Sequence, residues 1–353
     1  MVAPDGVNKS SIYEELLTKE AVLTRVYTGL MRILTALSAI FTLALSASPA
    51  LAQRLPFEQS FDSTGISTLD VSTIRGKINV VSGEADRIQI GGAVTVRIGV
   101  DVPENPLEIA KRIAANPPIA RAGDTVRLRP PADARDQKAV TVNYDVRVPP
   151  NTKILTVSDS GETIVAGLAG TVDVRTQSGA ITVQRLGGAT TISTDSGAVL
   201  VEGSNAPLTV KTSSSSFTAR ALGGHLHVRT MSGAVSAGFE GAGDVDIETG
   251  SSAIQLHGVR GAMTAASRSG RITVEGKPDR QWAVTTGSGS VDVAVASPPL
   301  TLDATSASGS VQVVGARVDG AVSKRAISGA IGSGGPMVRL SSRSGSIRVN
   351  VGR

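Results

Sequence analysis

The fold is decided by a repeat that is clearest at residues 172–201, which read VDVRTQSGAITVQRLGGATTISTDSGAVLV. In this stretch short alternating apolar segments flank each Ser-Gly pair, and the second pair follows the first after 18 residues. The same column of Ser continues along the chain as Ser160, Ser178, Ser196, Ser214, Ser232, Ser251, Ser269, Ser288, Ser308, Ser328 and Ser344. Self-similarity at such a period is the sequence signature of a solenoid.

Apolar and polar residues alternate on both sides of each Ser-Gly pair. Alternation with a period of two indicates β-strands with one buried face. Each repeat therefore predicts two short strands and two turns, and Gly-Gly at residues 187–188 and 223–224 marks the second turn. We predict one buried column that consists of Ile181, Val199, Phe217, Val235, Ile254 and Ile272.

A unit of two short strands cannot bury its apolar face alone. Stacked units can, if each strand pairs in parallel with its counterpart in the next unit. The sequence therefore predicts an all-β protein, a right-handed parallel β-helix or β-solenoid with two strands and about 18 residues per coil. We assign residues 53–150 to an N-terminal β cap with a short helical insertion at 103–116, and residues 151–353 to about eleven coils. Because little sequence follows the last predicted coil, we expect an uncovered strand edge there.

The N-terminal residues carry the features of an export signal. Arg32 precedes an apolar run at residues 33–45, and Ala50-Leu51-Ala52 is a small-x-small cleavage site. We predict a signal peptide at residues 31–52, an over-extended start at residues 1–30, and no membrane span in the mature chain. The apolar run is shorter than the roughly 20 residues that a span needs. The alternative is that residues 10–27 form a helix and the run anchors the chain.

Composition narrows the functional classes. The chain has no Cys, which excludes a disulfide framework and a thiolate metal site. Its net charge of +5 comes from 35 basic and 30 acidic residues without a long basic run, so we predict no nucleic-acid partner. A Ser beside Gly suits a turn, and we predict a structural role for a turn column rather than a catalytic or ice-binding hydroxyl array. This column includes Ser178, Gly179, Ser196, Gly197, Ser232, Gly233, Ser269 and Gly270.

One local cluster is a candidate surface site. Aligning residues 225–229 with residues 244–248 of the next coil gives three outward pairs, which are His225–Asp244, His227–Asp246 and Arg229–Glu248. Opposite charges on neighbouring strands stabilise a sheet by about 0.2–1 kcal/mol per pair. We interpret the six residues as a solvated charge ladder. The imidazoles and carboxylates could alternatively hold Zn²⁺ or another divalent ion, but we predict no metal and no other cofactor.

The strand VTVNYDVRVP at residues 140–149 leads directly into the Ser-Gly coils. With a strand that ends in Val-Pro followed by such coils, the chain from about residue 65 to 353 resembles the bacterial putative-adhesin β-strand-repeat family of unknown function. The resemblance implies a β-helix-like solenoid and an envelope location. It brings no catalytic residues.

These observations favour an exported, non-enzymatic β-solenoid in the periplasm or on the cell surface of a bacterium. We expect it to act as a cell-envelope scaffold or as a binding or adhesion surface for an envelope ligand, protein or polysaccharide. The alternative is a polysaccharide-active β-helix enzyme, a lyase or hydrolase. The short coils, nearly free of insertions, offer no obvious cleft for that chemistry, and Trp282 falls in a buried column.

N-terminal sequencing of the protein from its native envelope should find Gln53 as the first residue, because signal peptidase cuts after a small-x-small site. Retention of residues 31–52 in the isolated protein would instead establish the anchored alternative.

Overall fold

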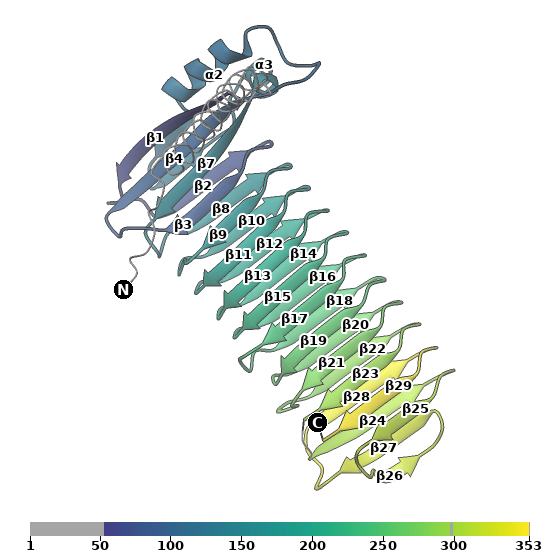
Figure 1. Ribbon diagram of the computed structural model, residues 1–353. Coiled ribbons are helices and arrows are strands. Elements are labelled where there is room, and N and C mark those ends of the chain that lie inside the picture. The colour runs from purple at the N-terminus through teal and green to yellow at the C-terminus, as the bar shows by residue number, and fades with distance from the viewer. Residues whose placement is uncertain (1–52, 297–298, 353) are drawn as a thin grey trace, which may run out of the picture. The chain divides into compact units, whose positions relative to one another are not determined.

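The computed structural model describes residues 53–296 and 299–352 (Figure 1). The predicted over-extended start at residues 1–30 and the predicted signal peptide at residues 31–52 lie outside the described residues. The described residues form a 14-stranded sheet and a 15-stranded sheet that face each other through one core. The predicted all-β solenoid is confirmed.

Successive strands alternate between the two sheets along the central part of the chain. In the 15-stranded sheet these strands are β8 (Lys153–Ser158), β10 (Val172–Thr176), β12 (Thr190–Thr194), β14 (Leu208–Thr212), β16 (Leu226–Thr230), β18 (Val245–Thr249), β20 (Met263–Ser267) and β22 (Trp282–Thr286). In the 14-stranded sheet they are β9 (Thr163–Ala166), β11 (Ile181–Leu186), β13 (Val199–Ser204), β15 (Phe217–Leu222), β17 (Val235–Phe239), β19 (Ile254–Val259), β21 (Ile272–Gly276) and β23 (Val291–Val295). Each strand pairs in parallel with its counterpart in the next coil, as Ile181 does with Val199.

The core consists of the inward-facing side chains of both sheets, one layer per coil. The predicted column from Ile181 to Ile272 is at most 2 % exposed throughout, which confirms the predicted register. Full burial of such a side chain stabilises the fold by about 1.5–3 kcal/mol, and here the burial comes from the coils above and below. Trp282 is also fully buried, and its indole N–H donates a hydrogen bond to the Gly261 carbonyl at 3.0 Å.

Coil stacking begins within the stretch assigned to the cap, because β2 (Thr68–Thr73) and β3 (Ile78–Ser82) pair in parallel with β8 and β9. The other elements there are β1 (Arg54–Asp62), β4 (Arg87–Val96), α2 (Pro106–Ala115), β5 (Ile119–Ala122), β6 (Thr125–Leu128), α3 (Ala134–Ala139) and β7 (Val140–Val148). β4 runs antiparallel to β1 and β7, so parallel stacking ends in antiparallel pairing. Neither described helix is long and apolar enough to cross a bilayer.

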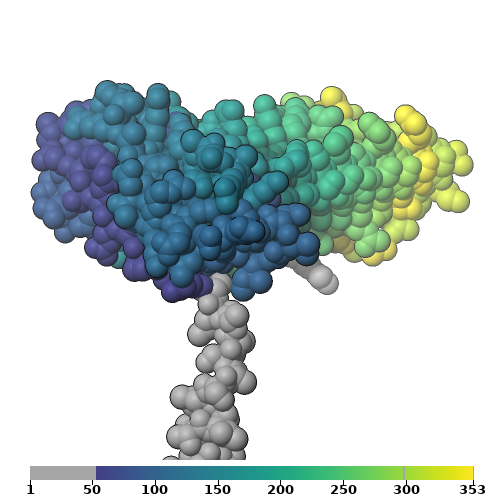
Figure 2. All heavy atoms as spheres, turned by 90° about the horizontal axis from the view of Figure 1, so that it is seen from above, coloured from purple at the N-terminus to yellow at the C-terminus, as the bar shows by residue number. Residues whose placement is uncertain are grey.

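A buried tyrosine connects the elements of this N-terminal region. The Tyr144 hydroxyl donates a hydrogen bond to the Arg129 carbonyl at 2.8 Å, and its ring meets the ring of Phe57 edge to face at 5.9 Å. Burial raises the pKa of Tyr144, so its hydroxyl keeps the proton that it donates. In the space-filling view this region, in purple and blue, is followed by coils that run from teal to yellow (Figure 2).

The last coil of the sequence lies inside the stack (Figure 1). β28 (Met337–Ser342) pairs with β22 on one side and with β24 (Leu300–Ser306) on the other. β29 (Ile347–Val351) lies in the same way between β23 and β25 (Val311–Val314). The expected free edge of the last coil is therefore wrong, since both of its strands are paired on both sides.

A hairpin covers the end of the 15-stranded sheet instead. It consists of β26 (Asp319–Val322) and β27 (Ala326–Ile331), and β27 runs antiparallel to β24. Ser328 lies in β27, so its predicted place at a coil turn is wrong. Antiparallel pairing stops the parallel repeat at this end of the 15-stranded sheet, whereas the 14-stranded sheet ends with the parallel strand β25.

The position of the last coil, β28 and β29, between its neighbours can be tested by placing a charge in its core. Val235→Asp and Val349→Asp should each lower the free energy of unfolding by about 3 kcal/mol or more, because each puts an unpaired carboxylate into a dry core. Urea denaturation followed by circular dichroism measures the effect, with the exposed Arg348→Gln as the control. A Val349→Asp protein that unfolds like the control would contradict the interior position of β29.

Candidate functional site

Each Ser-Gly turn brings successive backbones too close together for a side chain on the Gly. A Cβ on Gly179 would lie 1.9 Å from the Gly161 carbonyl oxygen, and real Cβ atoms do not come closer than 3.0 Å. The opposite turn of the coil also excludes a side chain, since a Cβ on Gly188 would lie 2.1 Å from the Gly170 carbonyl oxygen. The predicted column of Ser178, Gly179, Ser196, Gly197, Ser232, Gly233, Ser269 and Gly270 lies at the first kind of turn.

A buried column of hydroxyl groups holds these turns. Thr176 Oγ1 accepts a hydrogen bond from the Gly179 N–H at 3.0 Å, and Ser267 Oγ accepts one from the Gly270 N–H at 2.7 Å. The same bond recurs in other coils with the acceptors Ser158, Thr194, Thr212, Thr230, Thr286, Ser306 and Ser342. The turn therefore depends on a hydroxyl three residues before the Gly.

The sequence interpretation missed this hydroxyl column and gave its role to the Ser of the Ser-Gly pair. That Ser is exposed, and where it makes a bond, the bond goes to the previous coil, as from Ser178 Oγ to the Asp159 carbonyl at 3.2 Å. The signal was present in the sequence, since Ser or Thr recurs two positions before the Ser of the pair.

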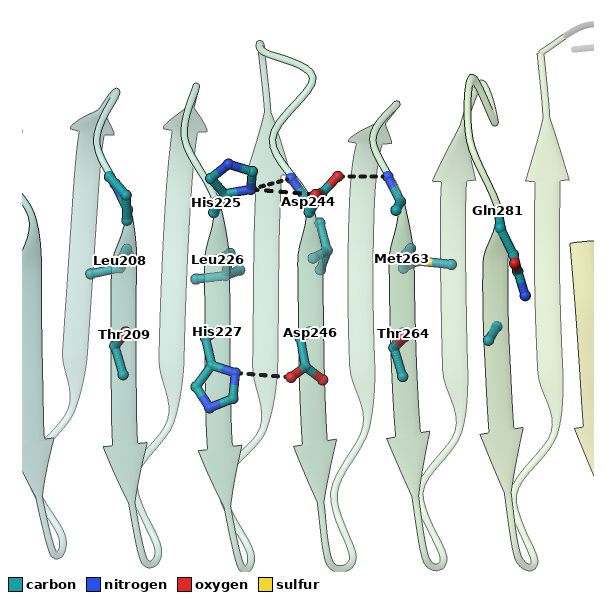
Figure 3. Close-up of a pocket in the computed structure, with 14 residues that line it drawn as sticks. Leu208, Thr209, His225, Leu226, His227, Asp244, Asp246, Met263, Thr264 and Gln281 are labelled. Atoms are coloured by element: carbon teal, nitrogen blue, oxygen red, sulfur yellow. Dashed lines mark hydrogen bonds and ion pairs between the residues drawn. The ribbon is translucent and has the colours of Figure 1, made fainter. Parts of the chain in front are cut away.

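The structure brings the residues of the charge ladder together on the outer face of the 15-stranded sheet, where β16 pairs with β18 (Figure 3). His227 Nδ1 lies 2.9 Å from Asp246 Oδ2. Arg229 binds Glu248 and also lies 3.3 Å from Asp246 Oδ2. These side chains are at least a third exposed, so each pair contributes about 1 kcal/mol or less to stability.

His225 lies beside Asp244 and makes its shorter contact with the backbone of Asp244. Its Nδ1 accepts a hydrogen bond from the backbone N–H of Asp244 at 3.0 Å, while the carboxylate oxygen Oδ2 is 3.7 Å away. Asp244 Oδ1 instead accepts the Ala262 N–H at 2.9 Å and binds Arg280, which sequence reasoning did not include. Arg280 precedes β22, two coils beyond Asp244, and no repeat spacing reveals where its side chain points.

The geometry does not bring the two imidazoles onto a common metal ion. Each ring turns its Nδ1 toward the next strand, and the remaining nitrogens of His225 and His227 point in opposite directions (Figure 3). In the part of the chain that the structure describes, no group of three or more His, Cys, Asp or Glu residues is placed to hold a metal ion. The divalent-ion alternative therefore gains no support from the ladder.

Two hollows lie side by side on this outer face. The first, of about 570 Å³, is lined by the beginnings of β14, β16, β18 and β20 and includes His225, His227, Asp244 and Asp246. The second, of about 1050 Å³, is lined by the ends of the same strands and includes Arg229. The ladder thus runs through a shallow groove that consists of these two hollows. Ser and Thr predominate only in the lining of the second hollow.

Comparison with known proteins finds a matching family model and similar solved structures. Residues 207–350, which contain the whole ladder, match the family model described as Toastrack DUF4097, and this confirms the predicted resemblance. A solved structure described as a putative adhesin from Bacteroides fragilis is similar at 14 % identity and a TM-score of 0.27, over 84 % of this chain and 96 % of that chain. One described as a putative cell adhesion protein from Clostridium sporogenes is similar at 9 % identity and a TM-score of 0.19, over 85 % and 100 %. No curated protein matches.

The hydroxyl column makes a prediction that distinguishes it from the Ser-Gly column. Thr176→Val keeps the side-chain shape but leaves the Gly179 N–H without its acceptor, so it should lower the free energy of unfolding by about 1–3 kcal/mol. Ser178→Ala should cost less than about 0.5 kcal/mol, because Ser178 is exposed. Urea denaturation of both variants decides between the columns. Equal effects, or a larger effect of Ser178→Ala, would reject the role assigned to Thr176.

Proposed function

We propose that the protein is exported to the bacterial cell envelope and acts there as a non-enzymatic scaffold or binding surface. We further propose that the groove over β14, β16, β18 and β20 is the surface that contacts its ligand. The predicted signal peptide and the resemblance to a family of exported solenoids support the location. The observation that carries the proposal is the groove itself, a rigid hollow that crosses neighbouring coils.

The polar groups of the groove suit recognition by hydrogen bonds. Thr209 lies beside His227 and Thr264 lies beside Asp246, so both flank the ladder (Figure 3). The second nitrogens of His225 and His227 point in opposite directions (Figure 3). Every aromatic side chain among the described residues is at least partly buried, so stacking of sugar rings on an exposed aromatic plays no part in this proposal. A ligand would instead lie along the face and bond to side chains from several coils.

The enzyme alternative is the weaker candidate because the three carboxylates of the charge ladder are already engaged. Asp244 is bound to Arg280, Asp246 to His227, and Glu248 to Arg229. A glycoside hydrolase needs one carboxylic acid and one carboxylate directed at the same bond of the substrate. Here Asp246 and Glu248 lie on β18, Asp244 directly precedes it, and each of the three contacts a basic neighbour.

A bulky side chain in the groove tests the proposed surface. Thr209→Arg should reduce retention of the purified protein on isolated envelope fractions by about tenfold or more, because it fills the groove. Thr218→Arg is the matched control, since Thr218 is also half-buried and projects outward from the opposite sheet of the same coil. Both variants should melt like the unmodified protein.

Equal retention of the two variants would contradict the groove as the contact surface. Release of soluble reducing sugars from the envelope fraction, abolished by Asp246→Asn, would establish the enzyme alternative instead.

A further inference from the structure

The net charge of the chain is concentrated at one end of the solenoid. Residues 53–298 contain 24 basic and 24 acidic residues, and residues 1–52 contain four of each. The whole net charge of +5 therefore comes from residues 299–353. Their basic residues are Arg317, Lys324, Arg325, Arg339, Arg343, Arg348 and Arg353, against the acidic residues Asp303 and Asp319.

Three of these basic residues meet around one turn, the connection from β24 to β25. On one side of this turn, the Ser308 N–H donates a hydrogen bond to the Arg343 carbonyl at 3.0 Å. On the other side, the Arg325 carbonyl accepts the Ser306 N–H at 2.8 Å, and the Lys324 carbonyl accepts the Val311 N–H at 2.9 Å. The backbone thus fixes Lys324, Arg325 and Arg343 within about two strand spacings of one another. We call these three residues the distal basic edge.

The distal basic edge carries charge that the fold does not use. All three side chains are exposed, and none of them forms an ion pair with another described residue. The neighbouring acidic residue Asp303 is bound by Arg339 instead. Exposed cations that form no ion pair within the protein can attract an external anion with their full charge.

An apolar side chain accompanies these charges. Val322 stands at the beginning of the hairpin turn that carries Lys324 and Arg325, and it is 64 % exposed. The remaining residues of β26 are exposed as well. Basic side chains beside an exposed apolar one form the combination by which proteins bind to the surface of an anionic bilayer, with the cations at the headgroups and the apolar group below them.

We infer that the distal basic edge, together with Val322, docks the end of the solenoid on an anionic lipid bilayer. Electrostatic attraction provides most of the binding, and insertion of Val322 distinguishes a bilayer from a soluble polyanion. This surface lies several coils away from the groove, so the inference stands independently of the proposed function.

Cosedimentation of the purified mature chain, residues 53–353, with lipid vesicles tests the inference. Vesicles with about 30 % phosphatidylglycerol in phosphatidylcholine should bind the protein at about 0.1 M salt, and vesicles of phosphatidylcholine alone should not. Replacement of Lys324, Arg325 and Arg343 by Gln should weaken binding by about 100-fold, since each basic residue near the surface contributes about a factor of five. Val322→Ser should weaken the binding further and should leave the salt dependence unchanged.

A matched control removes the same charge elsewhere. Arg127, Lys153 and Arg185 are exposed and form no ion pair with another described residue, so their joint replacement by Gln lowers the net charge equally. This control should bind the anionic vesicles like the unmodified protein. An equal loss of vesicle binding in both triple variants would show that the binding depends on net charge alone, and it would overturn the inference. So would no binding to anionic vesicles, or binding that soluble polyphosphate shares and that Val322→Ser leaves unchanged.

Discussion

Backbone contact at the glycine turns is the constraint on which the rest of the solenoid depends. Coils can pair as parallel strands only if they approach to about 4.8 Å, and at that spacing the Gly161 carbonyl occupies the place of a Cβ on Gly179. The Thr176 hydroxyl satisfies the Gly179 N–H at the same turn, so the two residues act as one unit. Where Ser215 replaces the Gly, its buried hydroxyl has no hydrogen-bond partner. With the turns fixed, parallel pairing and the apolar core follow.

This constraint explains how much of the fold could be predicted from the sequence. Most coils obey the same limits, so the register could be counted from residue to residue, and Val235 falls opposite Ile254 as counted. The pairing of His227 with Asp246 follows from the same count. Counting residues along the repeat does not specify the direction in which an outward-facing side chain points. His225 therefore lies closer to the backbone N–H of Asp244 than to its carboxylate, and Arg280 reaches Asp244 from the turn before β22.

The order of the last coils could not be predicted because two arrangements satisfy the same pattern. Leu302 follows Trp282 by 20 residues, a step similar to those elsewhere, so β24 could stack directly on β22. The structure places Val338 between them. Loop closure favours the direct arrangement only weakly, since each doubling of a loop costs about 0.6 kcal/mol. The intercalated coil gains two complete sets of strand partners, and the hairpin then covers the neighbouring edge.

A solenoid of this kind separates the residues that build the fold from those that are free to carry chemistry. Inward positions are fixed by packing and turn positions by close approach, which leaves the outward positions and the ends. The two surfaces proposed for function fall in those places, with the groove on the outer face and the distal basic edge at the end. Between β20 of the groove and β24, which begins the turn at the distal basic edge, lie β22 and β28. Three strand spacings separate the surfaces by about 15 Å, so a solenoid that stands on the membrane by this end would hold its groove at that height above the lipid headgroups.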